Sequence, residues 1–143
     1  MNIQGLQKVT LLDFPGRVAC TVFLSGCNFR CPFCHNASLV THVDPGRDIP
    51  EDEVLSFLKK RRGVLDGVCI TGGEPLLASG LDSFMCKIKD LGYEVKLDTN
   101  GSNTERLKTL IESGLIDYVA MDIKNSPGKY GMKIGRASCR ERV

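Results

Sequence analysis

The sequence predicts an α/β protein built on a parallel sheet. Short apolar segments alternate with segments of helical period, and glycines or capping residues separate them. This alternation is typical of βαβ units, whose strands are parallel and whose crossovers are right-handed. The 143 residues suffice for one domain with a single core, and 42% hydrophobic with 25% charged residues is a globular composition.

Four segments are expected to be strands, because each is short, apolar and bounded by turn-forming residues. They are residues 17–24, 66–71, 94–98 and 117–122. Three amphipathic helices are expected between them, at residues 50–62, 81–91 and 102–113. Pro50 suits the first helical position, and Ser102 with Glu105 predicts a capping box for the last helix.

Unusual residues follow each predicted strand. These segments are SGCNFRCPFCHN (25–36), GGEP (72–75), DTNG (98–101) and DIK (122–124). In parallel α/β folds, the carboxyl ends of the strands meet at one edge of the sheet, where binding sites form. The sequence therefore predicts one site built from all four segments.

The net charge and the cysteine content limit the classes of function that the sequence predicts. A formal net charge of +2 is too close to balance to predict binding to nucleic acid or to an acidic membrane. The sequence contains no run of 18 apolar residues, so no membrane span is predicted. It also shows no signal peptide, so the expected location is the cytoplasm. Because no signal peptide is expected to export the chain, its seven cysteines favour a metal or redox site over a disulfide framework.

Three of these cysteines, Cys27, Cys31 and Cys34, share one loop. Thiolates are soft ligands that suit zinc, copper(I) and iron–sulfur clusters. One interpretation is a zinc site completed by His35, although the usual distant second ligand pair is missing. Another is a c-type haem on the C-x-x-C-H string, which normally forms outside the cytosol. The third is a [4Fe–4S] cluster with three cysteine ligands, which leaves one iron open to a small molecule.

The spacing C-x3-C-x2-C resembles the signature of the radical S-adenosylmethionine (SAM) superfamily. This resemblance implies that Cys27, Cys31 and Cys34 ligate a [4Fe–4S] cluster and that SAM binds at the open iron. It implies a partial parallel (β/α) barrel, which here would be truncated after about four βα units. Nearby His35 is expected to make a supporting hydrogen bond rather than to ligate iron.

A second motif extends the resemblance. Residues 71–75 (TGGEP) resemble the GGE motif of the superfamily. The resemblance implies that Gly72, Gly73 and Glu74 bind the ammonium group of SAM, because glycines allow close backbone approach and a carboxylate attracts a cation. Phe33 matches the aromatic residue that packs near the adenine.

Further motifs resemble the glycyl-radical-enzyme activases, most closely the anaerobic ribonucleoside-triphosphate reductase activating proteins. They are LDFPG (12–16), CPFCHN (31–36), LDTNG (97–101) and MDIK (121–124), within a resemblance that covers nearly all of residues 3–130. In the related pyruvate formate-lyase activating enzymes, the residues matching Asp98, Thr99 and Asp122 surround a monovalent cation. Lys124 matches a lysine near the cofactor and the substrate peptide.

The mechanism implied by this resemblance is radical generation on a partner protein. A reduced cluster donates one electron to SAM, and the resulting 5′-deoxyadenosyl radical removes a hydrogen atom from a glycine α-carbon of a glycyl-radical enzyme. A donor such as flavodoxin or ferredoxin would supply the electron, and no side-chain general base is expected. Two alternatives remain open: a small-molecule radical SAM enzyme resembling 7-carboxy-7-deazaguanine synthase, and a non-enzymatic zinc- or haem-binding module.

The remaining cysteines and the C-terminus are expected to lie outside the site. Cys20, Cys69 and Cys86 fall in predicted strands and a helix, where a free cysteine commonly behaves as a small apolar residue. Residues 134–143 resemble a translated sequencing adapter. We therefore expect residues 1–133 to be the N-terminal part of a radical SAM domain and residues 134–143 to be a non-native tail.

Overall fold

The computed structural model describes residues 1–124 and 126, in which five strands form one sheet in the order β1-β2-β3-β4-β5. The strands are β1 (Ile3–Thr10), β2 (Ala19–Leu24), β3 (Gly67–Gly72), β4 (Glu94–Thr99) and β5 (Tyr118–Met121). Strands β2 to β5 are parallel, whereas β1 pairs antiparallel with β2. The predicted α/β class with a largely parallel sheet is confirmed, and the predicted tail at residues 134–143 lies outside the described residues.

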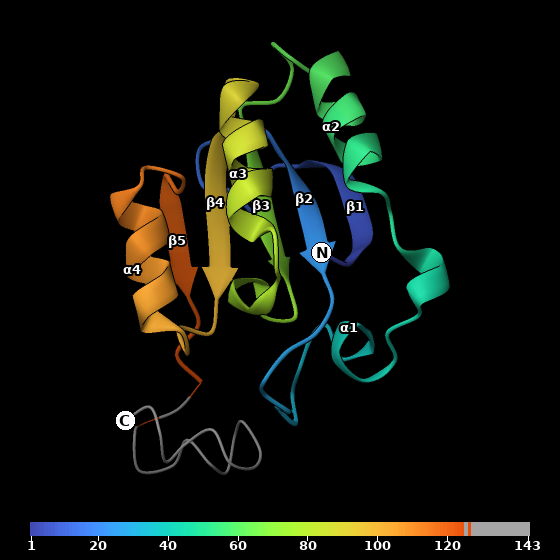
Figure 1. The fold of residues 1–143 in the computed structure, drawn as a ribbon, viewed down its shortest axis with the longest axis vertical. Helices are drawn as coiled ribbons and strands as arrows, with labels where there is room; N and C mark the ends of the chain where they lie inside the picture. The colour runs from blue at the N-terminus through green and yellow to red at the C-terminus, as the bar shows by residue number, and fades with distance from the viewer. Residues whose placement is uncertain (125, 127–143) are drawn as a thin grey trace.

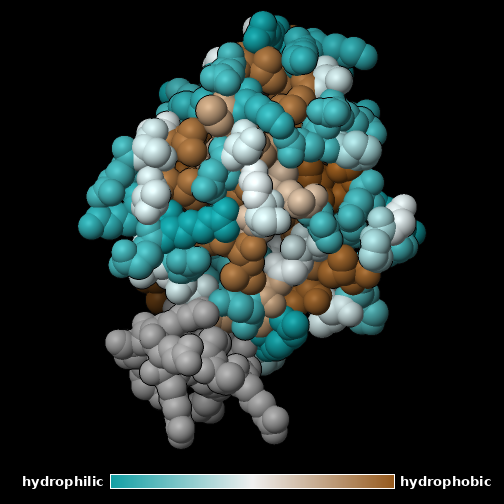
Figure 2. Space-filling model, viewed as in Figure 1, coloured by the Kyte–Doolittle hydropathy of each residue, from teal (hydrophilic) through white to brown (hydrophobic). Residues whose placement is uncertain are grey.

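Helices connect the parallel strands. They are α1 (Ser38–Thr41), α2 (Glu51–Lys60), α3 (Leu81–Asp90) and α4 (Thr104–Glu112), with short 3-10 helices at Pro45–Arg47 and Pro75–Leu77. In Figure 1, α2, α3 and α4 cover one face of the sheet. The outer surface of this helical layer is largely hydrophilic (Figure 2), as amphipathic helices require. In the part of the chain that is described, no helix is long and apolar enough to cross a membrane.

The hydrophobic core lies between this helical layer and the sheet. Alternate strand residues point toward the helices, because successive side chains of a strand face opposite sides. Fully buried members of this core are Val22, Leu24, Val68, Ile70, Val95 and Leu97 from the strands and Leu58, Phe84, Met85 and Ile88 from the helices. Burial of each such side chain stabilises the fold by about 1.5–3 kcal/mol.

The opposite, inner face of the sheet is polar near its centre. Thr21, Cys69, Lys96 and Asp98 occupy the alternate positions of β2, β3 and β4, and hydrogen bonds connect the last three. Lys96 and Thr21 are both buried. The two faces of the sheet therefore differ: one packs against helices and the other presents polar side chains.

Strand β1 is absent from the sequence prediction. Its sequence, IQGLQKVT, has no regular alternation, and only its first and last residues are buried. An edge strand has a partner on one side only, so its sequence carries a weak pattern. The short helix α1 was likewise not predicted, because four residues are too few to show a helical period.

The predicted capping box of α4 is wrong. The N-cap residue is Asn103, whose side-chain oxygen accepts a hydrogen bond from the Arg106 N–H at 3.2 Å. The Ser102 hydroxyl instead accepts a hydrogen bond from the Asn28 side chain at 3.0 Å. Asparagine caps helices as well as serine does, so local sequence alone did not distinguish these neighbours.

The loop between β1 and β2 closes the amino-terminal end of the sheet. Phe14, 3% exposed, packs against Tyr118 with ring centroids 6.0 Å apart. It also covers Gly67, where an added Cβ would lie 2.6 Å from the Phe14 ring. Beside it, Asp13 accepts a hydrogen bond from the Thr21 hydroxyl at 2.6 Å. The DFPG segment thus packs against the first residues of β3 and β5.

We expect Phe14→Ala to lower the free energy of unfolding by about 3 kcal/mol, because it leaves a cavity under β3 and β5. Chemical denaturation measures this change. The matched control is Leu12→Ala, since Leu12 is 89% exposed and its truncation should change the stability by less than about 0.5 kcal/mol. Equal effects of the two substitutions would contradict the assigned role of Phe14.

Candidate active site at the carboxyl ends of the strands

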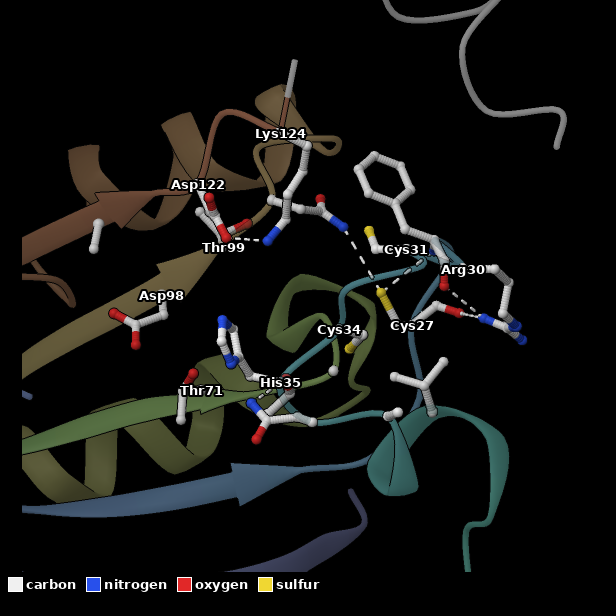
Figure 3. A pocket seen from close by; sticks show the side chains of 18 of the residues that line it. Cys27, Arg30, Cys31, Cys34, His35, Thr71, Asp98, Thr99, Asp122 and Lys124 are labelled. Carbon is white, nitrogen blue, oxygen red and sulfur yellow. Dashed lines mark hydrogen bonds and ion pairs between the residues drawn. The ribbon is translucent and has the colours of Figure 1, made fainter. Parts of the chain in front are cut away.

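A cavity of about 590 Å³ lies where the four parallel strands end. Residues from the segments after β2, β3, β4 and β5 all line it, so the predicted convergence of these segments is present in the structure (Figure 3). The predicted site residues that line it are Cys27, Cys31, Cys34, Gly72, Gly73, Asp98, Thr99, Asp122 and Lys124. Cavities of this size accommodate small-molecule cofactors.

The three loop cysteines are partly exposed to this cavity. Burial raises the pKa of the Cys27 thiol, and the Phe29 N–H, 3.3 Å from its sulfur, partly opposes the rise. Burial also raises the pKa of Cys31, and the nearby Lys124 ammonium opposes it. Within residues 1–124 and 126, no group of three His, Cys, Asp or Glu side chains is arranged to hold a single metal ion.

This donor set fits an iron–sulfur cluster. Three thiols from one loop face the same cavity, and thiolates are the usual ligands of such clusters. The N–H···S hydrogen bond at Cys27 and the positive charge beside Cys31 both favour the thiolate forms that ligation needs. The residues that would hold the cluster are therefore Cys27, Cys31 and Cys34.

The cysteine loop is attached to the end of β4. Asn28 donates a hydrogen bond to Ser102 at 3.0 Å and accepts one from the Asn100 side chain at 3.1 Å. The same Asn100 amide nitrogen lies 3.9 Å from the Cys27 sulfur. These contacts join segments more than 70 residues apart in sequence, and they fix the first thiol relative to the sheet.

The two glycines after β3 are required by backbone packing. An added Cβ on Gly72 would lie 2.1 Å from the Leu24 carbonyl oxygen, and one on Gly73 would lie 2.0 Å from that of Gly26. The Gly73 N–H also donates to Leu24 at 2.9 Å, and the Glu74 N–H donates to Gly26 at 2.8 Å. The Gly-Gly pair thus lies directly against the first residues of the cysteine loop.

The Glu74 side chain is buried against the end of β4. It is 1% exposed, and its carboxylate accepts hydrogen bonds from the Thr99 hydroxyl and the Asn100 N–H, both at 2.7 Å, and from the Leu76 N–H at 3.1 Å. It is not among the residues that line the cavity. These contacts hold the ends of β3 and β4 together, and its binding to an ammonium group stays a prediction.

Of the other predicted site residues, Phe33 lies outside the cavity lining, whereas Asp122 and Lys124 are part of it. Phe33 is 79% exposed and is not among the cavity-lining residues, so its packing against adenine stays a prediction. Asp122 and Lys124 both line the cavity and form an ion pair with each other (Figure 3). Burial alone would lower the pKa of Lys124, but its bond to Asp122 and the neighbouring thiols raise it, so its ammonium stays charged.

Sequence reasoning missed several residues of the cavity. Arg30, Asn100 and Lys96 line it, and none of them was predicted to do so. A signal for Lys96 was present: it stands two residues before Asp98 in the same strand, so both side chains belong to one face. Asn100 was included in the DTNG motif but received no role.

The other described cysteines lie outside the cavity lining. Cys20 and Cys69 are fully buried in β2 and β3, and burial raises the pKa of each thiol to about 12. Cys86 is exposed on α3. Their positions in strands and a helix agree with the elements predicted for them.

We expect Gly73→Ala to displace the cysteine loop, because its methyl group would overlap the Gly26 carbonyl. The predicted cost is about 2 kcal/mol of unfolding free energy, together with weaker iron binding after reconstitution. Gly46→Ala is the matched control, since a Cβ there meets only the flexible Asp44 carboxylate at 3.1 Å. Unchanged stability and iron content in Gly73→Ala would refute the packing argument.

Comparison with known proteins places the site in a family. The model of the radical SAM superfamily matches residues 21–143. Over 141 residues, the chain is 34% identical to the "Putative glycyl-radical enzyme activating enzyme" of Methanocaldococcus jannaschii, covering 97% of this chain and 55% of that protein. It is 27% identical to the pyruvate formate-lyase-activating enzyme of Staphylococcus aureus strain USA300 over 134 residues (87% and 53%).

Similarity extends to enzymes with other substrates. The chain is 42% identical to GTP 3′,8-cyclase of Helicobacter pylori strain ATCC 700392 / 26695 over 105 residues, or 70% of this chain and 28% of that enzyme. Among solved structures, QueE from Escherichia coli superposes with a TM-score of 0.58 at 19% identity, covering 71% of this chain and 53% of that one. TYW1 with a lysine-pyruvate adduct bound gives 0.55 at 20% identity (87% and 48%).

The chain spans about half the length of the activating enzymes that it matches. The family match itself covers most of the sequence and includes the three cysteines and the segments after β3, β4 and β5. Membership implies a [4Fe–4S] cluster and SAM as cofactors, which agrees with the three thiols that face the cavity. The chain belongs to the radical SAM superfamily.

Proposed function

We propose that this chain is part of a glycyl-radical-enzyme activase whose protein substrate is an anaerobic ribonucleoside-triphosphate reductase. The observation that carries the proposal is the cavity where the cysteine loop, GGEP, DTNG and DIK segments meet. The similarity to the named activating enzymes, which extends over 97% and 87% of the chain, supports it. The proposal includes a one-electron donor such as flavodoxin or ferredoxin, and a cytoplasmic location.

The cofactors would perform the electron transfer, and the chain would hold them in place. When bound, the reduced cluster supplies the electron that cleaves SAM and begins the radical chemistry. Cys27, Cys31 and Cys34 would hold the cluster, and the carbonyl groups of Gly72 and Gly73 would accept hydrogen bonds from the SAM ammonium group. Lys124, charged and close to the thiols, offsets negative charge at this side of the cavity.

The hydrogen bonds around Asn100 would fix the position of the cluster relative to SAM. Asn100 bonds to Asn28 in the cysteine loop and, through its backbone N–H, to Glu74 after β3. A site that controls a radical must orient the reacting groups and exclude water. Since the three segments share hydrogen bonds, a displacement of one of them would displace the cluster relative to SAM.

A small-molecule radical SAM enzyme is the second candidate. Its support is the 42% identity over 105 residues to a protein named GTP 3′,8-cyclase. This identity is higher than the 34% identity to the M. jannaschii protein, but that one extends over 141 residues. The activase is preferred because the similarity to the activating enzymes includes almost the whole chain, whereas that to the cyclase covers 70%.

The first test is the cluster. After anaerobic reconstitution with iron and sulfide, we expect an electron paramagnetic resonance (EPR) spectrum of a reduced [4Fe–4S] cluster that changes when SAM is added. Single substitutions Cys27→Ala, Cys31→Ala and Cys34→Ala should each abolish this spectrum, because each removes a ligand. Cys86→Ala is the matched control and should keep it. Stoichiometric zinc without iron, or equal loss in the control, would refute the assignment.

The second test separates the two candidates. An anaerobic ribonucleoside-triphosphate reductase labelled with α-deuterated glycine is mixed with the reconstituted protein, SAM and a reductant. An activase should produce a glycyl-radical EPR signal and 5′-deoxyadenosine that carries deuterium. Unlabelled 5′-deoxyadenosine without that signal, together with turnover of GTP, would favour the small-molecule enzyme. Since the chain spans about half of its relatives' length, low activity of the 143 residues alone is expected.

A further inference from the structure

A buried lysine, Lys96, lies in the wall of the cavity. The residue is 6% exposed, and its ammonium forms an ion pair with Asp98. Its nitrogen also lies 3.8 Å from the Cys69 sulfur and 6.0 Å from the centre of the Tyr118 ring. A charge buried to this extent is stable only beside an opposite charge, so Lys96 and Asp98 form a fixed pair on the inner face of the sheet.

The surroundings keep Lys96 charged. Its ammonium contacts the Asp98 carboxylate, and an opposite charge in contact favours the charged form of a buried group. Asp13 is held near this face by the Thr21 hydroxyl. The ammonium is therefore a positive charge held against the Asp98 carboxylate of β4, with Asp13 bound to the same face of the sheet.

The carboxylates expected to bind a monovalent cation already have cationic partners. Asp98 pairs with Lys96 through one oxygen, and its other oxygen accepts from the Cys69 thiol at 3.6 Å. Asp122 pairs with Lys124. In each pair the two residues are separated by one position, on the same strand or on the segment that leaves it.

The third expected ligand is also engaged within the protein. The Thr99 hydroxyl donates to Glu74 at 2.7 Å and accepts from the Gly101 N–H at 3.1 Å. Its oxygen thus serves as both donor and acceptor. A sodium or potassium ion needs several free oxygen ligands, and here it would also be repelled by the buried ammonium of Lys96. The residues present do not fit the monovalent cation implied by the activase resemblance.

We propose that the Lys96 ammonium is the resident cation of this site and takes the place of a bound sodium or potassium ion beside Asp98. The charge balance that a dissociable ion would supply is thereby built into β4. Binding of SAM and folding of this chain should then not depend on monovalent metal ions. The inference concerns the chain's own residues and holds whether the radical acts on a protein or on a small molecule.

The test is thermal unfolding of the purified chain in potassium, sodium or tetramethylammonium chloride at equal ionic strength. Tetramethylammonium is too large for a carboxylate site between strands, so it controls for screening. The wild type should have the same Tm in all three salts. As a direct measurement, sodium-23 NMR line widths should show no saturable binding to the wild type. A saturable rise of Tm, or saturable sodium binding, in the wild type would overturn the proposal.

The variant Lys96→Gln should show that a cation is required beside Asp98. Removing one partner of a buried pair should lower the Tm by roughly 10 °C or more, and potassium or sodium, but not tetramethylammonium, should restore part of the loss. The double variant Lys96→Gln/Asp98→Asn should lose most of this ion response, because the carboxylate that pairs with the ammonium is removed as well.

Lys108→Gln is the matched control, since Lys108 lies on the exposed surface of α4 with its side chain 68% exposed. It should match the wild type in every salt. If Lys96→Gln folds and shows no ion response, Lys96 does not replace a cation. If it fails to fold in every salt, the sodium-23 measurement on the wild type still decides the question. Because neither measurement uses SAM cleavage, failure here is distinguishable from failure of the proposed activase function.

Discussion

The site depends on one buried carboxylate, that of Glu74. It accepts hydrogen bonds from Thr99 and Asn100 after β4 and from Leu76 in its own turn. A carboxylate that is 1% exposed requires such donors, because burial without them is costly. Asn100, fixed in this way, holds Asn28 of the cysteine loop. The relative positions of three of the four segments therefore follow from the hydrogen bonds of two side chains, Glu74 and Asn100.

The glycines before Glu74 act in the same region by steric means. Gly72 and Gly73 let the end of β3 approach the carbonyl groups of Leu24 and Gly26 so closely that no side chain would fit. The contact of this motif with the ammonium group of SAM stays a prediction. In this chain, the same residues also set the distance between the end of β3 and the loop that carries the thiols.

The inner face of the sheet gives the cavity its electrostatic character. Lys96 and Asp98 are buried together, and Lys124 and Asp122 form a second, more exposed pair at the end of β5. Pairing neutralises the carboxylates before any ligand binds. A site with balanced charges suits a cofactor such as SAM, which itself carries both positive and negative groups, because neither sign is left in excess.

The sequence by itself determined the parallel strands, the three main helices and the convergence of four segments, because hydrophobic period, glycines and prolines act locally. Cysteine spacing and the GGE motif also identified the family. Only the tertiary structure decided which side chains face the cavity. The buried Glu74 carboxylate accepts hydrogen bonds from the Thr99 hydroxyl and the Asn100 N–H at the end of β4, and Ser102 bonds to Asn28 instead of capping α4. Lys96 joined the site because strand alternation places it beside Asp98 and opposite Cys69. These hydrogen-bonding partners belong to different segments of the chain, so the local sequence pattern does not predict their contacts.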